Sequence, residues 1–181
     1  GVYIIEKNAF PNSVVEVATA IPAFIGHTQF ARDGNKDLTD IPFRISSMAE
    51  FHSFFGFAPT LRFGIRPEDS ESEDTTNDIN VLFPDGSCQL TLPKTFYALY
   101  YNMLLFYANG GGPCYIVSVG DYEHDFKSID FTNALLALKK EQEPTLVVVP
   151  EAVYMEEGDC YKVQTAALMH CGNDMKNRFA I

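Results

Sequence analysis

Positively charged residues are scarce in this chain of 181 residues. Its 13 Lys and Arg stand against 24 Asp and Glu, which gives a formal net charge of −11. Proteins that bind nucleic acid or anionic membranes meet phosphate groups with clustered Lys and Arg. We therefore expect neither as a partner. Long apolar runs are missing too: no stretch reaches the roughly 18 residues of a membrane-spanning helix, so we expect no membrane insertion.

Cysteine pairs are also missing. No C-x-x-C motif is present, and the start of the chain has no signal-peptide pattern, so we expect a cytoplasmic compartment and no disulfides. We interpret Cys114 and Cys171 as small buried apolar residues. The histidines form neither H-E-x-x-H nor a Cys/His pair at metal spacing, and we expect no metal site. The residues considered are Cys88, Cys114, Cys160, Cys171, His27, His52, His124 and His170.

Motifs of enzymes and nucleotide-binding proteins are missing as well. The chain has no G-x-S-x-G, no Gly-Lys-[Ser/Thr] and no G-x-G-x-x-G. The glycine-rich run at Asn109–Pro113 follows an expected helix and precedes an expected strand, so it would present carbonyls rather than amides to a phosphate. We interpret it as a helix end. The sequence predicts no cofactor and no enzyme activity.

One alternative stays open at the ends of two expected strands. Glu123-His124-Asp125 follows one strand, and His27 follows another at Gly26. Ligands bind at the carboxyl ends of strands in open α/β sheets, so His124 could act as a base or metal ligand there. An ordinary polar loop is the other interpretation. The alternative function is a small-ligand-binding α/β enzyme with its site near Gly26–Thr28 and Gly120–Asp125.

A strongly acidic segment interrupts the middle of the chain. Residues 67–78 include six carboxylates and no apolar side chain. Carboxylates can bind Ca²⁺, but the glycine-kinked spacing of an EF-hand loop is missing. We predict a solvated loop over residues 66–80.

Short apolar strands alternate with helices along the rest of the chain. Ser47 and Glu50 have the spacing of a capping box, and Gly56 is placed to stop that helix. Asp130 and Asp159 are expected to cap two later helices. The expected strands are 21–26, 43–45, 114–119, 145–150 and 178–181, and the expected helices are 48–55, 93–109, 131–142 and 160–171. This order predicts an α/β fold: a mostly parallel sheet with helices on both faces.

Two segments suggest contacts beyond the domain itself. The helix expected over Pro93–Asn109 is apolar nearly all round, which predicts burial on more than one face, by its own domain or by neighbouring subunits. The opening run is apolar on both strand faces and predicts an extended arm that pairs with another chain; its residues are Val2, Tyr3, Ile4 and Ile5. We divide the chain into this N-terminal arm and linker, 1–13, and an α/β body, 14–181.

Several segments, in order, resemble the contractile tail sheath proteins of phages and phage-tail-like injection systems. Gly1–Ile4 is similar to their P-G-V-Y-I opening, and Thr19–Thr28 to a segment ending in A-F-x-G-x-T. Ile45–Gly56 resembles the family's next segment, and Phe106–Val119 its F-F-x-N-G-G-x-x-C-Y-V-V-R-V. Thr145–Pro150 and Asn177–Ile181 match later strands. The family-motif residues are Gly26, Phe51, Gly56, Asn109, Gly110, Gly111, Cys114 and Tyr115.

The resemblance implies a structural subunit that stacks as hexameric rings around an inner tube and contracts to drive it through a target envelope. It implies homo-oligomeric neighbours linked by exchanged arm strands, contact with the tube protein through a later C-terminal region, and baseplate partners. It also implies assembly in the bacterial cytoplasm and a place in a phage tail or released particle. A baseplate or cap relative that does not polymerise is a further alternative.

Two departures from the family pattern stand out. Ser118 occupies a position where many relatives carry Arg, and the segment between Ala58 and Pro93 is short beside relatives that insert a domain there. The chain also stops where the matched strand normally continues. We therefore expect the sequence to hold the N-terminal arm and most of the α/β body, without the tube-contacting region.

Overall fold

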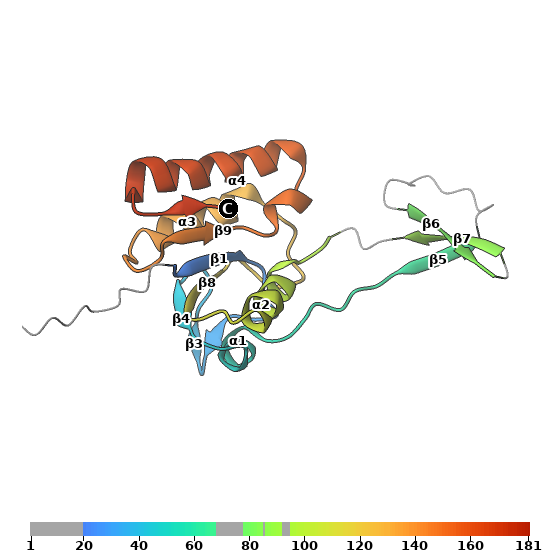
Figure 1. The fold of residues 1–181 in the computed structure, drawn as a ribbon, viewed down its shortest axis with the longest axis horizontal. Helices are drawn as coiled ribbons and strands as arrows, with labels where there is room; N and C mark the ends of the chain where they lie inside the picture. The colour runs from blue at the N-terminus through green and yellow to red at the C-terminus, as the bar shows by residue number, and fades with distance from the viewer. Residues whose placement is uncertain (1–19, 68–77, 85, 92–94) are drawn as a thin grey trace, which may run out of the picture.

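The computed structural model describes residues 20–67, 78–84, 86–91 and 95–181, and its main feature is a five-stranded sheet (Figure 1). The strand order is β10-β9-β1-β8-β4, in which β4 is antiparallel to β8 and the other neighbours are parallel. The predicted α/β class is confirmed, whereas the arm at residues 1–13 lies outside the described residues. The strands are β1 Pro22–Gly26, β4 Phe43–Ile45, β8 Cys114–Ser118, β9 Leu146–Val148 and β10 Phe179–Ala180.

Two pairs of helices cover the two faces of this sheet. Alternate residues of β1 show the division: Ala23 and Ile25 pack in the core beneath α3 and α4, and Phe24 packs in the core beneath α1 and α2. The period of two along a strand sends neighbouring side chains to opposite faces, so a fully apolar strand needs both covers. The helices are α1 Met48–Phe55, α2 Leu99–Ala108, α3 Ser128–Leu138 and α4 Glu157–Met169.

Helix α1 begins and ends at the predicted residues. The Ser47 hydroxyl accepts a hydrogen bond from the Glu50 amide at 3.2 Å, as a capping box requires. The Glu50 carboxylate, however, accepts from the amide of Ser46 at 2.6 Å, one residue before the expected partner. Gly56 follows the helix at φ 86°, a conformation that favours glycine, and donates its amide to the carbonyl of His52.

The starts of the other three helices differ from the prediction. Helix α2 begins at Leu99, because Tyr97 leaves the helical path to pack against the ring of His27. Asp130 lies within the first turn of α3 and is not its cap. Asp159 likewise lies inside α4, where its carboxylate accepts from Ser128 and Lys162 at 2.9 and 2.7 Å.

The ends of two helices differ as well. Helix α3 stops at Leu138, four residues before the predicted end at Gln142. Helix α4 continues as a π-helical turn, His170–Met175, in place of the predicted stop at Gly172. This turn closes with the amide of Lys176, at φ 52°, donating to the carbonyl of Cys171.

Helix α2 buries only part of its apolar surface within the described chain. Leu99 and Met103 are fully buried against the sheet, but the side chain of Leu105 is 65% exposed and that of Leu104 is exposed too. The described part of the body therefore leaves one side of α2 uncovered. Burial of the exposed side by a neighbouring subunit stays a prediction.

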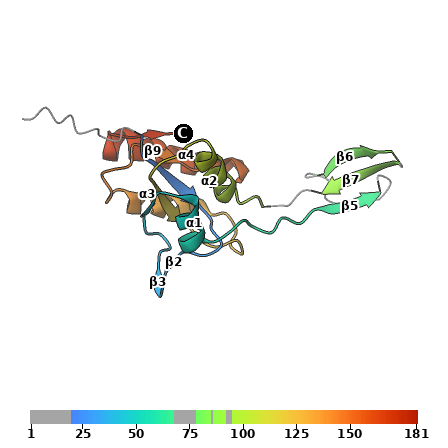
Figure 2. The same ribbon diagram turned by 60° about the horizontal axis from the view of Figure 1, so that its bottom comes forward.

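A second, smaller sheet lies apart from the body (Figures 1 and 2). Its strands are β5 Gly64–Pro67, β6 Asp78–Phe83 and β7 Gly86–Thr91, all antiparallel with β7 in the centre. The solvated loop predicted over residues 66–80 is thus wrong at both ends, where Pro67 and Asp78 belong to strands that pair with β7. Residues 68–77 lie outside the described part of the chain.

Two minor elements complete the described chain. A tight turn after Asp33 joins β2 Arg32–Asp33 to β3 Lys36–Asp37, and a short 3₁₀ helix, η1 Ala152–Tyr154, follows β9. Among the described residues, no helix combines the length and apolar character that crossing a membrane requires.

Candidate functional site

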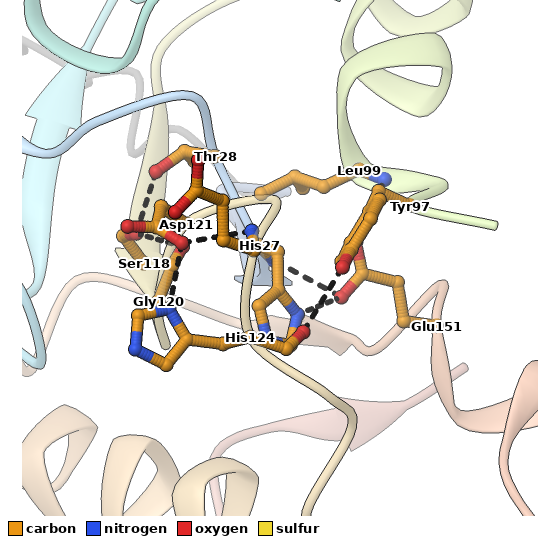
Figure 3. Close-up of polar contacts among 10 residues, drawn as sticks. His27, Thr28, Tyr97, Leu99, Ser118, Gly120, Asp121, His124 and Glu151 are labelled. Atoms are coloured by element: carbon orange, nitrogen blue, oxygen red, sulfur yellow. Dashed lines mark hydrogen bonds and ion pairs between the residues drawn. The ribbon is translucent and has the colours of Figure 1, made fainter. Parts of the chain in front are cut away.

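The loops at the carboxyl ends of β1, β8 and β9 come together in one place (Figure 3). The chain leaves β1 toward α1 on one face of the sheet and leaves β8 toward α3 on the other. Such a divergence between adjacent parallel strands is where open α/β sheets bind ligands. Two segments were predicted as a possible ligand site, Gly26–Thr28 and Gly120–Asp125. The structure brings these two segments together.

Glu151 is the group that joins these loops. Its side chain is fully buried, and its carboxylate accepts hydrogen bonds from the amides of His27 at 2.9 Å and Leu99 at 3.3 Å. Because Leu99 is the first residue of α2, the carboxylate satisfies an unpaired amide at the positive end of that helix. Glu151 therefore connects the loop after β9 to the end of β1 and the start of α2.

His27 completes this buried contact. Its Nδ1 lies 2.8 Å from the Glu151 carboxylate, and its ring packs among Tyr97, Phe126 and Phe131 at centroid distances of 5.3, 5.1 and 5.7 Å. Its Nε2 is buried without a hydrogen-bond partner among the described residues. The side chain has no exposed surface, so a substrate in solution cannot reach it. This geometry fits a buried contact that holds chain segments together rather than a reactive group.

Two hydroxyls beside His27 also bond to their surroundings. The Oγ atoms of Thr28 and Ser118 are 2.6 Å apart, and both residues are buried. Thr28 also donates to the carbonyl of Phe30, and Ser118 lies within reach of the carbonyl of Gly120. No histidine contacts either hydroxyl in the described chain, so neither has the adjacent base that activates a nucleophile.

An exposed pair, Asp121 and His124, lies at the surface of this region. His124 Nδ1 is 2.6 Å from the Asp121 carboxylate. The pKa of Asp121 is lowered, mainly by the amide of Glu123 and then by His124. The pair borders an open groove of about 460 Å³ that Asp37, Lys127 and other polar residues also line. Side chains of both charges line the groove, and they do not form a set of groups that matches one ligand.

The structure offers no candidate metal centre within its described range. No group of three or more His, Cys, Asp or Glu side chains converges among those residues. The side chain of His124, the residue proposed as a metal ligand or base, pairs with Asp121 across the turn, and its carbonyl accepts from the hydroxyl of Tyr97. The inter-subunit arm residues Val2, Tyr3, Ile4 and Ile5 lie outside the described residues.

Three family-motif residues fit tight places in the fold. A Cβ on Gly26 would lie 2.9 Å from the Cβ of Leu99 and 3.1 Å from the Glu151 carboxylate. The close approach of Glu151 and Leu99 therefore requires a glycine at this position. Gly56 allows the chain to turn against the side chain of Gln29. Phe51 is fully buried in the core between α1 and the sheet.

The motif at the end of α2 has equally specific contacts. The side-chain amide of Asn109 donates to the carbonyl of Leu105 at 2.7 Å, and Gly110 has φ 82°. A Cβ on Gly111 would lie 2.5 Å from the ring of Phe106. The motif therefore ends the helix, as predicted, and folds the chain back over Phe106.

The last two motif residues lie at the start of β8. Cys114 is buried, and desolvation raises the pKa of its thiol to about 11, which keeps it protonated and unreactive. The hydroxyl of Tyr115 donates to Glu143 at 2.8 Å, and Glu143 also accepts from Arg44 at 2.9 Å. Burial, followed by this carboxylate, raises the pKa of Tyr115 to about 12.

Sequence reasoning missed two buried polar centres. Glu151 carried one signal, an acidic residue directly after the apolar run 145–150 that was predicted as a strand. The other centre is Arg178, whose guanidinium donates to the carbonyls of Leu138 and Glu141 at the end of α3 and to Nε2 of His170. Nothing in the local pattern around Arg178 indicates burial.

Comparison of the sequence with models of known protein families and with curated proteins finds no match.

Proposed function

We propose that the chain is part of a structural sheath subunit, which polymerises as stacked hexameric rings around an inner tube and contracts to drive the tube through a target envelope. The observation that carries the proposal is the place of the motif segments. The segments similar to the sheath family contain β1, β8, β9 and β10, which lie side by side as the parallel part of one sheet. A scattered set of chance matches has no reason to select adjacent strands.

The polar residues at the carboxyl edge support a structural rather than a chemical role. Glu151 and His27 are both fully buried and bonded to each other, and the Glu151 carboxylate also accepts from the amides of His27 and Leu99. Thr28 and Ser118 bond to each other. These groups hold the strand ends and α2 in place, which suits a body that must move as a unit within a lattice.

The exposed side of α2 supports contacts with neighbouring subunits. Leu105 and Leu104 present aliphatic surface to solvent on a helix whose other side is packed in the core. Contiguous exposed apolar surface marks interaction sites. In a ring, this side of α2 would be covered by the adjacent copy.

Electron microscopy of the full-length protein, alone and with its tube partner, tests the proposal. We expect rings or tubes, and their absence under both conditions would refute it. A monomeric particle bound to a baseplate would favour the baseplate or cap relative instead. Deleting Gly1–Asn8 should abolish assembly and leave the thermal stability of the monomer unchanged, because all five described strands of the sheet lie later in the chain. A large drop in monomer stability would show that the arm pairs within its own chain.

A second candidate function rests on the groove beside Asp121 and His124. Its position at the strand ends and its exposed carboxylate–imidazole pair suit a small-ligand-binding α/β enzyme. A screen of nucleotides and divalent metal ions by thermal shift separates the two functions. A ligand whose shift is lost in His124→Ala favours the enzyme, and no shift with any compound leaves the sheath proposal.

A further inference from the structure

Arg178 and His170 form a buried polar contact beside the end of α3. The two residues are 3% and 2% exposed, and Nη1 of Arg178 lies 3.1 Å from Nε2 of His170. The same guanidinium donates to the carbonyls of Leu138, the last residue of α3, and Glu141. Three segments therefore meet at the His170–Arg178 pair: the end of α3, the π-helical turn, and the chain that enters β10.

The chemistry of the two side chains decides the protonation state of His170. A guanidinium has only hydrogen-bond donors, so the Nε2 atom that faces it must accept, and the imidazole is neutral with its proton on Nδ1. That Nδ1 atom is buried and has no hydrogen-bond partner among the described residues. A second proton on the ring would turn the acceptor into a donor and bring two positively charged groups into contact.

The other groups around His170 do not offset this repulsion. Burial lowers the pKa of His170 most, followed by the charge of Arg178. Asp174 favours the charged ring, but its carboxylate is already paired with Lys139 at 2.7 Å, and Lys139 acts in the opposite direction. The carbonyl of Leu135 favours the charge as well, without carrying a charge of its own. Two further titratable groups beside the pair act on Arg178: Cys171 and Glu141.

Among these three segments, β10 is the least firmly held in the described chain. Helix α3 is anchored by four buried side chains, and α4, which leads into the π-helical turn, by two. In contrast, β10 is two residues long and lies at the edge of the sheet. The amides of Phe179 and Ile181 hold it to β9, at 3.0 and 2.9 Å from the carbonyls of Thr145 and Val147, and Phe179 is 74% exposed. Local opening therefore costs least at β10.

We propose that the His170–Arg178 pair is a pH-sensitive switch, in which protonation of His170 releases Arg178 from the end of α3 and frees β10 from β9. The guanidinium and the imidazolium both gain water as they separate, which removes the repulsion between them. The strands β9, β1, β8 and β4 keep their order, because none of their hydrogen bonds involves the pair.

The release of β10 would uncover an interaction surface. An apolar groove of about 320 Å³ lies between β9 and α4, where Val147, Val163 and Ala167 line it together with Ala180 and Ile181. Departure of the last two residues widens the groove and leaves the backbone edge of β9 unpaired. A free strand edge beside an apolar groove accepts an added strand, so the switch would open such a site in acid and close it at neutral pH.

The size of the effect follows from proton linkage. Once released, His170 takes up a proton near the ordinary value of about 6.5, whereas in the closed state it does so only at lower pH. The open fraction is therefore constant well above that value and rises as the pH falls, until the lowered pKa of the closed state is reached. Between pH of about 7.5 and about 5.5, a single proton allows a rise of up to about tenfold.

Two cysteines supply a native probe and its control. Cys171 directly follows His170, is buried, and lies close enough to Arg178 for that charge to act on its thiol. A thiol reagent therefore reaches Cys171 only when the pair opens. Cys114 is fully buried in β8, inside the sheet, and reports unfolding of the whole body. Cys88 and Cys160 are partly exposed and are replaced by Ser for the experiment.

The test is labelling of the full chain with dithiodipyridine at the two pH values, with each rate divided by that of a free cysteine peptide at the same pH. We expect the rate at Cys171 to rise several-fold in acid, up to about tenfold, while Cys114 stays unlabelled. Hydrogen exchange provides the second measurement, in which the protection factors of the Phe179 and Ile181 amides should fall by the same factor.

Two variants assign the response to the pair. His170→Gln keeps an oxygen that can accept from Arg178 but takes up no proton, so its labelling rates should be equal at the two pH values. The matched control is His52→Gln, which removes an imidazole from α1 on the other face of the sheet. It should keep the parent's response to pH.

Three outcomes would overturn the inference. Equal rates at Cys171 in the parent at both pH values would show that the pair does not open. An unchanged rise in His170→Gln would assign the response to another group. Labelling of Cys114 in step with Cys171 would show that the whole body unfolds instead of β10. The first and third comparisons need only the parent, so they hold even where a variant at position 170 fails to fold.

Discussion

The α/β body and the small three-stranded sheet differ in how far they bury their apolar side chains. The body encloses its apolar residues between two layers of helices, with Phe51 and Phe55 fully buried on one side of the sheet and Phe131 on the other. The small sheet leaves Ile65 and Ile79 exposed. Among the described residues, the body is therefore closed by its own helices, whereas the small sheet leaves aliphatic side chains in water.

The sharpest test of this contrast compares one apolar residue from each region. Phe51→Ala should lower the free energy of unfolding by about 3–5 kcal/mol, because it opens a cavity in a packed core. Ile65→Ala should change the free energy of unfolding of the isolated chain by about 0.5 kcal/mol or less, since its side chain is already in water. Urea unfolding followed by far-UV circular dichroism measures both. Similar losses in the two variants would contradict the contrast.

Buried polar contacts extend the comparison. Glu151→Leu should destabilise the body by about 3 kcal/mol, because it leaves the amides of His27 and Leu99 buried without an acceptor. Gln89→Leu in the small sheet removes a partly buried contact with Arg66 and should cost about 0.5 kcal/mol. Chemical denaturation measures the free energy of unfolding of both variants. A smaller loss in Glu151→Leu than in Gln89→Leu would show that water replaces the carboxylate.

Two neighbouring glycines at the end of α2 allow a comparison within the body, between a tightly packed position and an open one. Gly111→Ala places a Cβ 2.5 Å from the ring of Phe106 and should destabilise by about 1–3 kcal/mol. Gly112→Ala is the control, because a Cβ there meets nothing within 4 Å, and we expect a change below about 0.5 kcal/mol. Thermal unfolding of both variants provides the measurement. Equal melting temperatures would mean that Phe106 moves aside without cost.

The smallest expected effect is a dependence of stability on pH that belongs to the body. Burial, and then the charge of Arg178, lowers the pKa of His170, whereas residues 64–91 contain no histidine. The unfolded chain therefore takes up this proton at a higher pH than the folded chain. Stability should fall as the pH drops through the ordinary value of about 6.5, with a slope approaching about 1.4 kcal/mol per pH unit, until the lowered folded pKa is reached.

The comparison for this effect is His170→Gln, which keeps a polar side chain but cannot take up the proton. The difference in unfolding free energy between the two proteins should shrink or reverse on acidification, because only the parent loses this contribution. A difference that stays constant between neutral pH and pH of about 5 would contradict the assignment of the effect to His170.

Local signals in the sequence were enough to predict the parts of the fold that local chemistry decides. Ser47 and Gly56 mark the ends of α1 because a cap and a left-handed turn involve only neighbouring residues. The strand at Phe43–Ile45 and the Val- and Ile-rich strand from Cys114 were predicted for the same reason. Their alternation with helices was sufficient for the α/β class.

Contacts between distant residues explain what was missed. His27 and Glu151 are 124 positions apart, so no local pattern reports their pairing. Tyr97 leaves the expected helix for the aromatic cluster around His27. The small sheet did carry a signal, since Asp85-Gly86 is a hairpin dipeptide between alternating apolar residues, but the acidic run before it favoured a loop. The candidate site could be located from strand ends, but the burial of Glu151 and its pairing with His27 could not.

The two ends of the segment that holds the small sheet meet at one side chain. Tyr122 donates its hydroxyl to the carbonyl of Phe57 at 2.9 Å, and its ring lies 5.1 Å from the ring of Tyr97. The chain thus leaves the body and returns to it at neighbouring points. Insertions and deletions between them cost little more than the entropy of closing a longer or shorter loop. The small sheet and its connections, residues 60–95, therefore form a unit that could be exchanged for another module, while Phe96 keeps its packing on Tyr101 and Tyr154 and the body keeps its strand order.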